Sequence, residues 1–177
     1  MNHSAPRPRR PAPPAGWRRR AARLPVRLFR IGLGPLFGGR LLLLVHTGRL
    51  TGAARTAVLE VVEHTASPCS WTVASGYGPE AQWYRNLGHT PRATVQSGRR
   101  FHAVTARFLP AEDGGQIMAR YAEARPRTAA RLCAYLGLGA DGTPEGYREA
   151  GRLIPFVRLE CDPACHRPRG RGRASGG

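Results

Sequence analysis

The sequence predicts a small antiparallel β-barrel of mixed α+β class, with its helices clustered rather than alternating with the strands. Six short apolar or alternating segments occur, mostly joined by the short connections that suit antiparallel neighbours. Most helical patterns fall together between residues 110 and 151, which argues against a doubly wound sheet. The 177 residues suffice for one domain with a sizeable core.

Each strand is read from its apolar pattern. The strongest apolar run, LLLLV, begins the first strand, and RTAVLEVV and CSWTVAS give the next two. Ser97 and Gly98 separate a short strand from a longer one as a tight hairpin. In chain order, the expected strands span residues 40–47, 55–62, 69–75, 92–98, 99–109 and 153–160.

The helices are read from prolines at first turns and from capping residues. Pro126 begins a helix that ends at Gly137 in the manner of a C-cap, and Thr143 caps a short helix with Pro144 at its first position. The expected helices span residues 25–37, 79–87, 110–124, 126–137 and 143–151.

Charge is distributed unevenly along the chain. All 28 basic residues are arginine, against 11 acidic residues, and none of the acidic residues precedes Glu60. We expect residues 1–20 and 163–177 to be disordered basic tails around a barrel domain of residues 21–162. Aromatic side chains are not interleaved with the basic runs, so no specific nucleic-acid partner is expected.

The N-terminal region bears on localisation. No apolar run approaches the roughly 20 residues of a spanning helix, and Arg23, Arg27 and Arg30 interrupt what would be a signal peptide. A cytoplasmic protein is therefore expected. These arginines form one stripe on the expected helix, and most of its other positions are apolar. The apolar part of residues 21–37 either covers a barrel mouth or lies on the inner face of the cell membrane, and the first reading is favoured.

Four cysteines, at positions 69, 133, 161 and 165, are too few and too scattered for a disulfide framework. The segment CDPACH, residues 161–166, has some features of a metal or haem-attachment site. Its spacing is not C-x-x-C-H and no second ligand pair accompanies it. We therefore expect no metal site.

The segment HTGRLTGAARTAVL, from His46, is the main candidate for ligand binding. Gly48 and Gly52 allow a sharp turn and a close approach of the backbone to a ligand. Arg49 and Arg55 offer forked donors suited to phosphate or carboxylate. The segment is neither a Walker A nor a Rossmann motif. The alternative is an ordinary basic loop in a basic protein.

Two further segments accompany this loop. VASGYG ends a strand in small residues whose backbone amides could meet a polar ligand. PEAQWYRNL places Trp83 and Asn86 on one helix face, as a flat heterocycle would require. The alternative is a core tryptophan with a capping asparagine.

Taken in order, TGRLTGAARTAVL, VASGYG and WYRNL, with Pro91 four residues further on, resemble the deazaflavin-dependent nitroreductase family. The resemblance covers roughly residues 25 to 160, including IPFVRL near the end. It implies a split β-barrel of the flavin-reductase type that binds reduced coenzyme F420. The chain departs from the family pattern at Leu50 and Gly76, where a cation is usual, and at Thr90, where asparagine is usual.

The resemblance also implies roles for individual residues. Arg49, Thr51 and Arg55 would meet the coenzyme phosphate, and Trp83 with Asn86 would flank the deazaflavin. The residues that would line the ring and its linker are Thr56, Ala57, Val58, Ala74, Ser75 and Gly76.

The expected function is an F420-dependent oxidoreductase that passes a hydride to a flat electron-poor acceptor such as a quinone, nitroaromatic or enone. Tyr121, Tyr135 and Tyr147 are candidates for a proton donor or for pocket walls, and simple packing is as good a reading of each. The alternatives are an FMN-dependent enzyme of the same fold and a non-catalytic protein that binds coenzyme or polyanions. The chain is expected to be a monomer or a homodimer.

Overall fold

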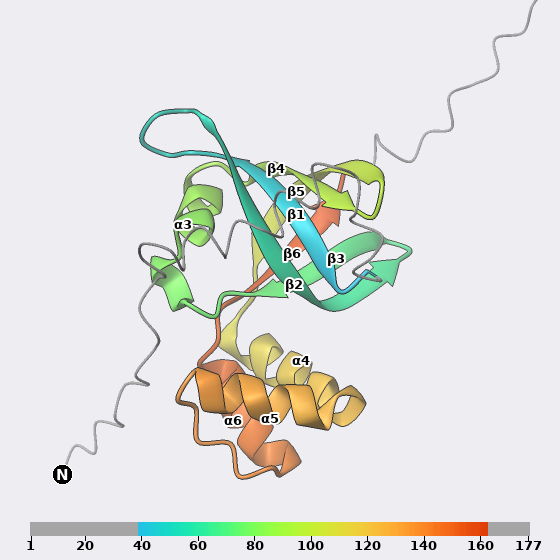
Figure 1. Ribbon diagram of the computed structural model, residues 1–177, viewed down its shortest axis with the longest axis vertical. Helices are drawn as coiled ribbons and strands as arrows, with labels where there is room; N and C mark the ends of the chain where they lie inside the picture. Colours follow the sequence, from blue (N-terminus) through green and yellow to red (C-terminus); the bar gives the residue numbers. More distant parts are fainter. Residues whose placement is uncertain (1–38, 163–177) are drawn as a thin grey trace, which may run out of the picture.

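The computed structural model describes residues 39–162, which form a closed six-stranded barrel with helices at one end (Figure 1). Neighbouring strands are antiparallel, in the order β1-β2-β3-β6-β5-β4. The strands are β1 Leu41–Thr47, β2 Ala54–Ala66, β3 Cys69–Ala74, β4 Arg92–Ser97, β5 Arg100–Phe108 and β6 Phe156–Cys161. The helices are the 3-10 turn η2 Gly78–Glu80, α3 Gln82–His89, α4 Ala111–Ala124, α5 Pro126–Tyr135 and α6 Pro144–Arg152.

The predicted barrel of about six antiparallel strands is confirmed. β2 is longer than expected and runs on to Ala66, through polar residues that gave no strand signal. Its far half pairs with β3, with His64 opposite Trp71, and the two rings stack with centroids 5.1 Å apart. Cross-strand pairs of this kind stabilise a sheet locally, which explains the extension.

The barrel interior is filled by aliphatic side chains from all six strands. Leu42 and Leu44 of β1 are fully buried, and Leu43 between them is also buried, so this part of β1 is covered on both faces. Val73, Val95 and Val157 from three other strands are equally buried in the same cluster. The apolar core of the barrel is therefore separate from the polar loops at its ends.

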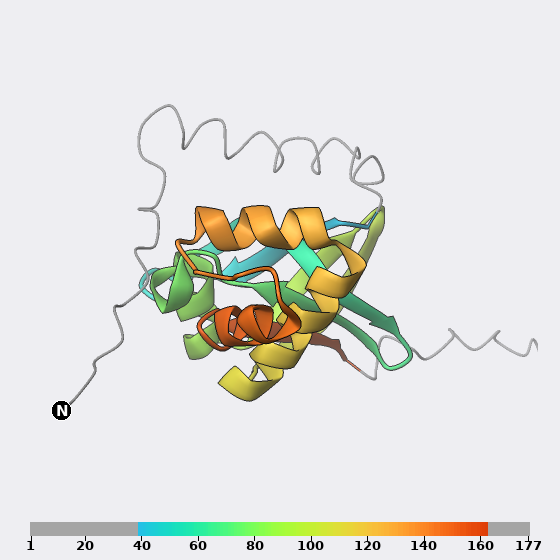
Figure 2. The same ribbon diagram turned by 90° about the horizontal axis from the view of Figure 1, so that it is seen from below.

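The helices α4, α5 and α6, here called the helical insertion, lie between β5 and β6 in the chain and pack at one end of the barrel (Figures 1 and 2). α4 and α6 approach closely because glycines line their contact. A Cβ atom on Gly114 would lie 2.8 Å from the carbonyl oxygen of Gly151. The Thr143 cap is confirmed, since its Oγ1 accepts from the Gly146 backbone N–H at 3.0 Å.

The structure also joins Cys69 to Cys161 by a disulfide, which the scattered cysteines had not suggested. The two residues are 92 positions apart in the chain, but β3 and β6 are neighbours in the barrel and their Cα atoms lie 5.4 Å apart. Only the strand order, which the sequence did not reveal, brings them together.

Several predictions lie outside the described residues. These are the helix expected over 25–37, the membrane contact through 21–37, the basic tails at 1–20 and 163–177, and any role of Cys165. Within residues 39–162, no helix is both long enough and apolar enough to cross a membrane.

Candidate functional site

Residues 47–55, here called the arginine loop, comprise the connection between β1 and β2 and the strand residues next to it, and they form a tight turn built on two glycines. The Gly52 backbone N–H donates to Gly48 O at 2.7 Å, and the Gly48 N–H donates to Ala53 O at 2.8 Å. Gly52 has a φ of +67°, and a Cβ on Gly48 would lie 3.2 Å from Ala53 O. A side chain is therefore strained at Gly52 and crowded at Gly48.

Arg49 is held against α3 by two side-chain amides. Its backbone N–H and its NH1 group donate to Asn86 Oδ1 at 3.2 and 3.0 Å, and NH1 also donates to Gln82 Oε1 at 2.9 Å. Asn86 is only 5% exposed, so the loop is fixed to a rigid element. A guanidinium has five N–H donors, which leaves others of Arg49 free for a ligand.

His46 completes this network beneath the loop. Asn86 Nδ2 lies 3.2 Å from His46 Nδ1, and because an amide nitrogen can only donate, the imidazole accepts and is neutral. Burial lowers the pKa of His46, the backbone hydrogen bond with Thr47 opposes this, and the charge of Arg55 lowers it further. Arg55 is the cross-strand partner of His46, so the two groups repel when His46 is protonated.

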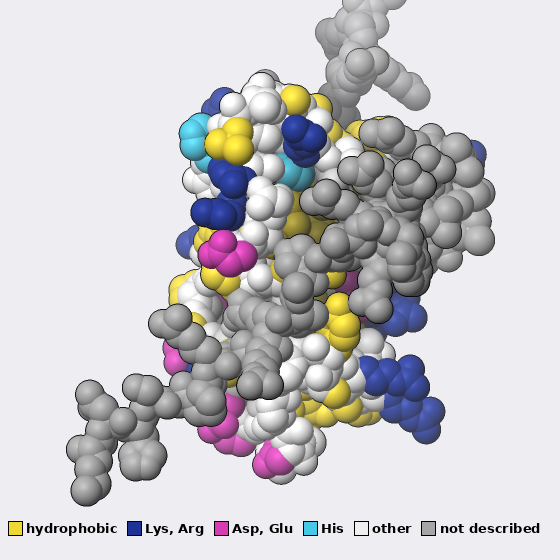
Figure 3. Space-filling model, turned by 60° about the vertical axis from the view of Figure 1, so that its left-hand side comes forward, with side chains coloured by type: hydrophobic (Ala, Val, Ile, Leu, Met, Phe, Trp, Pro, Cys, Tyr) yellow, Lys and Arg dark blue, Asp and Glu magenta, His cyan; other side chains and the backbone are white. Residues whose placement is uncertain are grey.

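The arginine loop carries positive charge that the described part of the protein does not neutralise. Within residues 39–162, neither Arg49 nor Arg55 forms an ion pair with a carboxylate. On the molecular face shown in Figure 3, arginine side chains occur over both the upper, barrel part and the lower part, whereas most of the visible acidic side chains lie lower. A hollow of about 310 Å³ beside the loop is lined by His46, Thr47, Gly52 and Arg92, among others. This arrangement suits an anionic ligand.

The other predicted loop residue, Thr51, is exposed, and its Oγ1 accepts from the Ala53 N–H at 3.3 Å. The predicted lining residues of β2 are Thr56, Ala57 and Val58, all half-buried and paired with β1. The structure therefore places them directly after the loop, on the strand that continues from it.

The strand end at Ala74–Gly76 forms a second turn that is stabilised by its own serine. Ser75 is 2% exposed, its Oγ donates to Gly78 O at 2.6 Å and its N–H donates to Pro155 O at 2.8 Å. Both polar groups of Ser75 are thus engaged within the protein. Gly76 is half-buried and faces Leu136, which lies just after α5.

Trp83 packs in the barrel core and is 9% exposed. Its ring meets Tyr84 edge-on with centroids 5.8 Å apart. Only a small part of the Trp83 surface is therefore open to a ligand, whereas its neighbour Asn86 is occupied by Arg49 and His46.

The three tyrosines expected to approach the substrate lie in different surroundings. Tyr147 is buried in the core of the helical insertion, and the Tyr121 hydroxyl donates to Glu60 at 3.0 Å beneath the Arg125 guanidinium. Tyr135 is 61% exposed and lies next to Tyr77, a residue that sequence reasoning missed. Burial, and then the neighbouring Tyr135, raise the pKa of Tyr77. The sequence signal that could have identified Tyr77 is its position in VASGYG, directly after the predicted lining residues.

A family model described as F420H(2)-dependent quinone reductase matches residues 19–132 of the chain. A solved structure described as F420-H2 dependent reductase (FDR-A) is 25% identical, covers 68% of this chain and 94% of its own, and has a TM-score of 0.48. One described as a domain-swapped dimer is 24% identical, with coverages of 77% and 99% and a TM-score of 0.47.

A protein from Clostridium acetobutylicum, related to general stress protein 26 of B. subtilis and described as of the pyridoxinephosphate oxidase family, is 7% identical. The alignment covers 76% of this chain and 84% of that one, with a TM-score of 0.46. A search of curated proteins found no significant match.

Proposed function

The chain belongs to the F420H(2)-dependent quinone reductase family, and we propose that it binds reduced coenzyme F420 at the arginine loop and reduces a flat, electron-poor acceptor. Quinones are the first acceptor class to test, followed by nitroaromatics and enones. The observation that carries this proposal is the pair Arg49 and Arg55, which have no carboxylate partner within residues 39–162 and flank a turn built for close backbone approach.

The donor set of the loop fits the anionic part of F420. The coenzyme carries a phosphodiester and a glutamate tail, both of which accept forked hydrogen bonds from guanidinium groups. Arg49 is already oriented by Asn86 and Gln82, so less conformational entropy is lost when a ligand binds. The side chain of Arg55 lies beside Gly48, because a Cβ atom at position 48 would be 3.4 Å from Arg55 Cγ.

Reduced F420, when bound, would supply the hydride. The chain itself would bind and orient the reactants and exclude water, which is the usual contribution of a protein to cofactor chemistry. Thr56, Ala57, Val58, Ala74, Ser75 and Gly76 remain our proposed lining residues, with Trp83 and Asn86 beside the ring and Thr51 near the phosphate.

Tyr77 and Tyr135 are our proposed proton donors to the acceptor. Conversion of a quinone to a hydroquinone takes one hydride and one proton in total. Both hydroxyls carry a proton at neutral pH, and Tyr135 is 61% exposed, so solvent can return a proton through it to its neighbour Tyr77. Tyr121 and Tyr147 have structural contacts instead, so we assign them to packing.

The proposal is tested by titrating the full-length protein with F420 and with FMN side by side. We expect F420 to bind in the micromolar range or tighter, which corresponds to about 8 kcal/mol, and FMN to bind more weakly. Oxidation of reduced F420 by a soluble quinone is then followed by absorbance. Tighter binding of FMN would indicate a flavin-dependent enzyme, and tight F420 binding without turnover of any acceptor class would indicate a coenzyme-binding protein.

We further propose a cytoplasmic protein that acts as a monomer or a homodimer. Light scattering of the purified protein measures the oligomeric state. The membrane contact proposed for residues 21–37 predicts that the full chain, but not a chain lacking these residues, floats with anionic vesicles in a density gradient.

A further inference from the structure

A cluster of three metal-binding side chains lies at the end of the barrel away from the arginine loop. Cys69 begins β3, Cys161 ends β6 and His102 lies in β5. One donor atom from each side chain lies within 4.8 Å of the other two, and all three residues are half-buried. β2 runs from the arginine loop at Ala54 to the turn before Cys69, so its length of 13 residues separates the cluster from the proposed coenzyme site.

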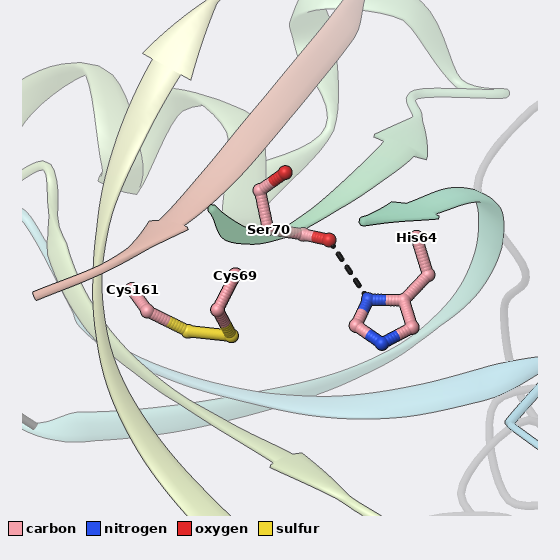
Figure 4. The surroundings of a disulfide bond; sticks show 4 residues. All are labelled: His64, Cys69, Ser70 and Cys161. Carbon is pink, nitrogen blue, oxygen red and sulfur yellow. Dashed lines mark hydrogen bonds between the residues drawn. A yellow bond between two sulfur atoms is a disulfide. The ribbon is translucent and has the colours of Figure 1, made fainter. Parts of the chain in front are cut away.

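Strand pairing alone brings these residues together. Ser70 of β3 pairs with Glu160 of β6, so the next residues along, Cys69 and Cys161, also face each other (Figure 4). Cys161 pairs in turn with Val104 of β5. His102 is two residues from Val104 and therefore a diagonal neighbour of Cys161 on the same face of the sheet.

The histidine is supported by a buried tryptophan. The rings of His102 and Trp71 pack with centroids 4.9 Å apart, and Trp71 is 3% exposed. His64 stacks on Trp71 as well and is fixed by a hydrogen bond between its Nδ1 and Ser70 O of 2.9 Å. Packing of this kind restricts how far the imidazole can turn from the two sulfur atoms.

We propose that, when the Cys69–Cys161 disulfide is reduced, Cys69, Cys161 and His102 bind a zinc ion. Two thiolates and one imidazole form a known zinc ligand set, and Zn–S and Zn–N bonds of about 2.0–2.3 Å place the donor atoms about 3.5–4 Å apart. After reduction the two sulfur atoms, which are now bonded, would move apart to this separation, whereas the imidazole donor atom already lies within 4.8 Å of both. A hollow of about 630 Å³ lined by the cluster leaves room for a fourth ligand.

A thiol reductant converts the disulfide into the form that binds zinc. Two molecules of a small thiol reduce the protein disulfide to two protein thiols and are themselves joined as a disulfide. Zinc then displaces the two thiol protons as it binds.

Cys161, the first residue of the segment CDPACH, is the one member of that segment that belongs to the proposed site. The other two ligands come from elsewhere in the barrel, Cys69 from β3 and His102 from β5. The same residues thus join β3 to β6 covalently under oxidising conditions, and join β3, β5 and β6 through zinc under reducing conditions.

The test is a cobalt titration of the full-length protein, reduced with a phosphine and kept free of oxygen. We expect a thiolate-to-cobalt charge-transfer band that saturates at one cobalt per chain and is removed by added zinc. Cys69→Ser and His102→Gln should each weaken cobalt binding by more than about tenfold. Cys133→Ser is the matched control, because Cys133 is a free cysteine buried in the helical insertion, and it should leave the band unchanged.

A negative wild-type titration overturns the proposal even if a variant fails to fold. Absence of the charge-transfer band in the reduced wild-type protein would overturn the proposal. So would an undiminished band in Cys69→Ser, because the metal would then be held by Cys161, Cys165 and His166 alone. Zinc should also raise the melting temperature of the reduced wild-type protein and not that of Cys69→Ser.

Discussion

Replacement of Arg49 or Arg55 by alanine tests the proposed binding of the coenzyme and, for Arg49, separates it from the hydrogen bonds that this residue makes to α3. A charge-assisted hydrogen bond contributes about 1.5–3 kcal/mol, so loss of either guanidinium should weaken F420 binding about ten- to a hundredfold. Arg49 also makes three hydrogen bonds to Asn86 and Gln82, of which one is exposed. The backbone bond survives substitution, and we expect a loss of stability of about 1 kcal/mol for Arg49→Ala.

Arg55→Ala should weaken binding without this loss of stability, since Arg55 has no carboxylate partner within residues 39–162. Calorimetric titration with F420 and a melting curve are measured for each variant. Lysine should restore binding only in part, because an ammonium lacks the fork. Arg148→Ala, which removes an exposed ion pair on α6, is the control and should change neither quantity appreciably.

The reasoning is refuted if both alanine variants bind F420 as the wild-type protein does. In that case the loop is only a connection between two strands, and its positive charge has no ligand. A parallel loss of binding and folding in Arg55→Ala would also count against it, because that residue is expected to act on the ligand alone.

Three further predictions concern the loop, the buried histidine and the helical contact. Leu50 is 85% exposed at the loop, so Leu50→Arg should tighten F420 binding without affecting the melting temperature; weaker binding would place the anion elsewhere. Burial holds the pKa of His46 below its unfolded value of 6.5, so the unfolded chain takes up the proton first. The free energy of unfolding should thus fall as pH drops below 6.5, by at most about 1.4 kcal/mol per pH unit. Urea titrations at several pH values measure this slope, and the slope should be smaller for His46→Gln. Gly114→Ala should lower the free energy of unfolding by about 1–3 kcal/mol, because the new Cβ meets the backbone of α6. Gly139→Ala, which has open space around it, should lower it much less in the same urea titrations.

The fold was predictable because its signals are local. Each strand shows itself as an apolar run or an alternation, and the Ser97–Gly98 hairpin and the Thr143 cap follow from residues that are adjacent in the chain. The length of β2 was not predictable, since its polar second half is a strand only through its pairing with β3. The described helices also begin within a few residues of the expected prolines.

The site was predictable only in part. The glycines and arginines of the loop lie within nine residues, so their pattern could be read directly. The bonds from Arg49 to Asn86 span 37 positions, and the approach of Tyr77 to Tyr135 depends on how α5 packs. Contacts of this kind are fixed by the strand order and by helix packing, which a single sequence does not express.

The helical insertion has a consequence for how the family can diversify. The chain leaves the barrel after β5 and returns to it before β6, and these strands are neighbours whose ends meet, with Phe108 opposite Val157. The Leu109 N–H donates to Phe156 O at 3.0 Å, so both connections emerge at one place. Segments with adjacent ends can be exchanged without disturbing their host. The three helices can therefore be replaced as a unit without disturbing the arginine loop and α3, where we propose that the coenzyme binds.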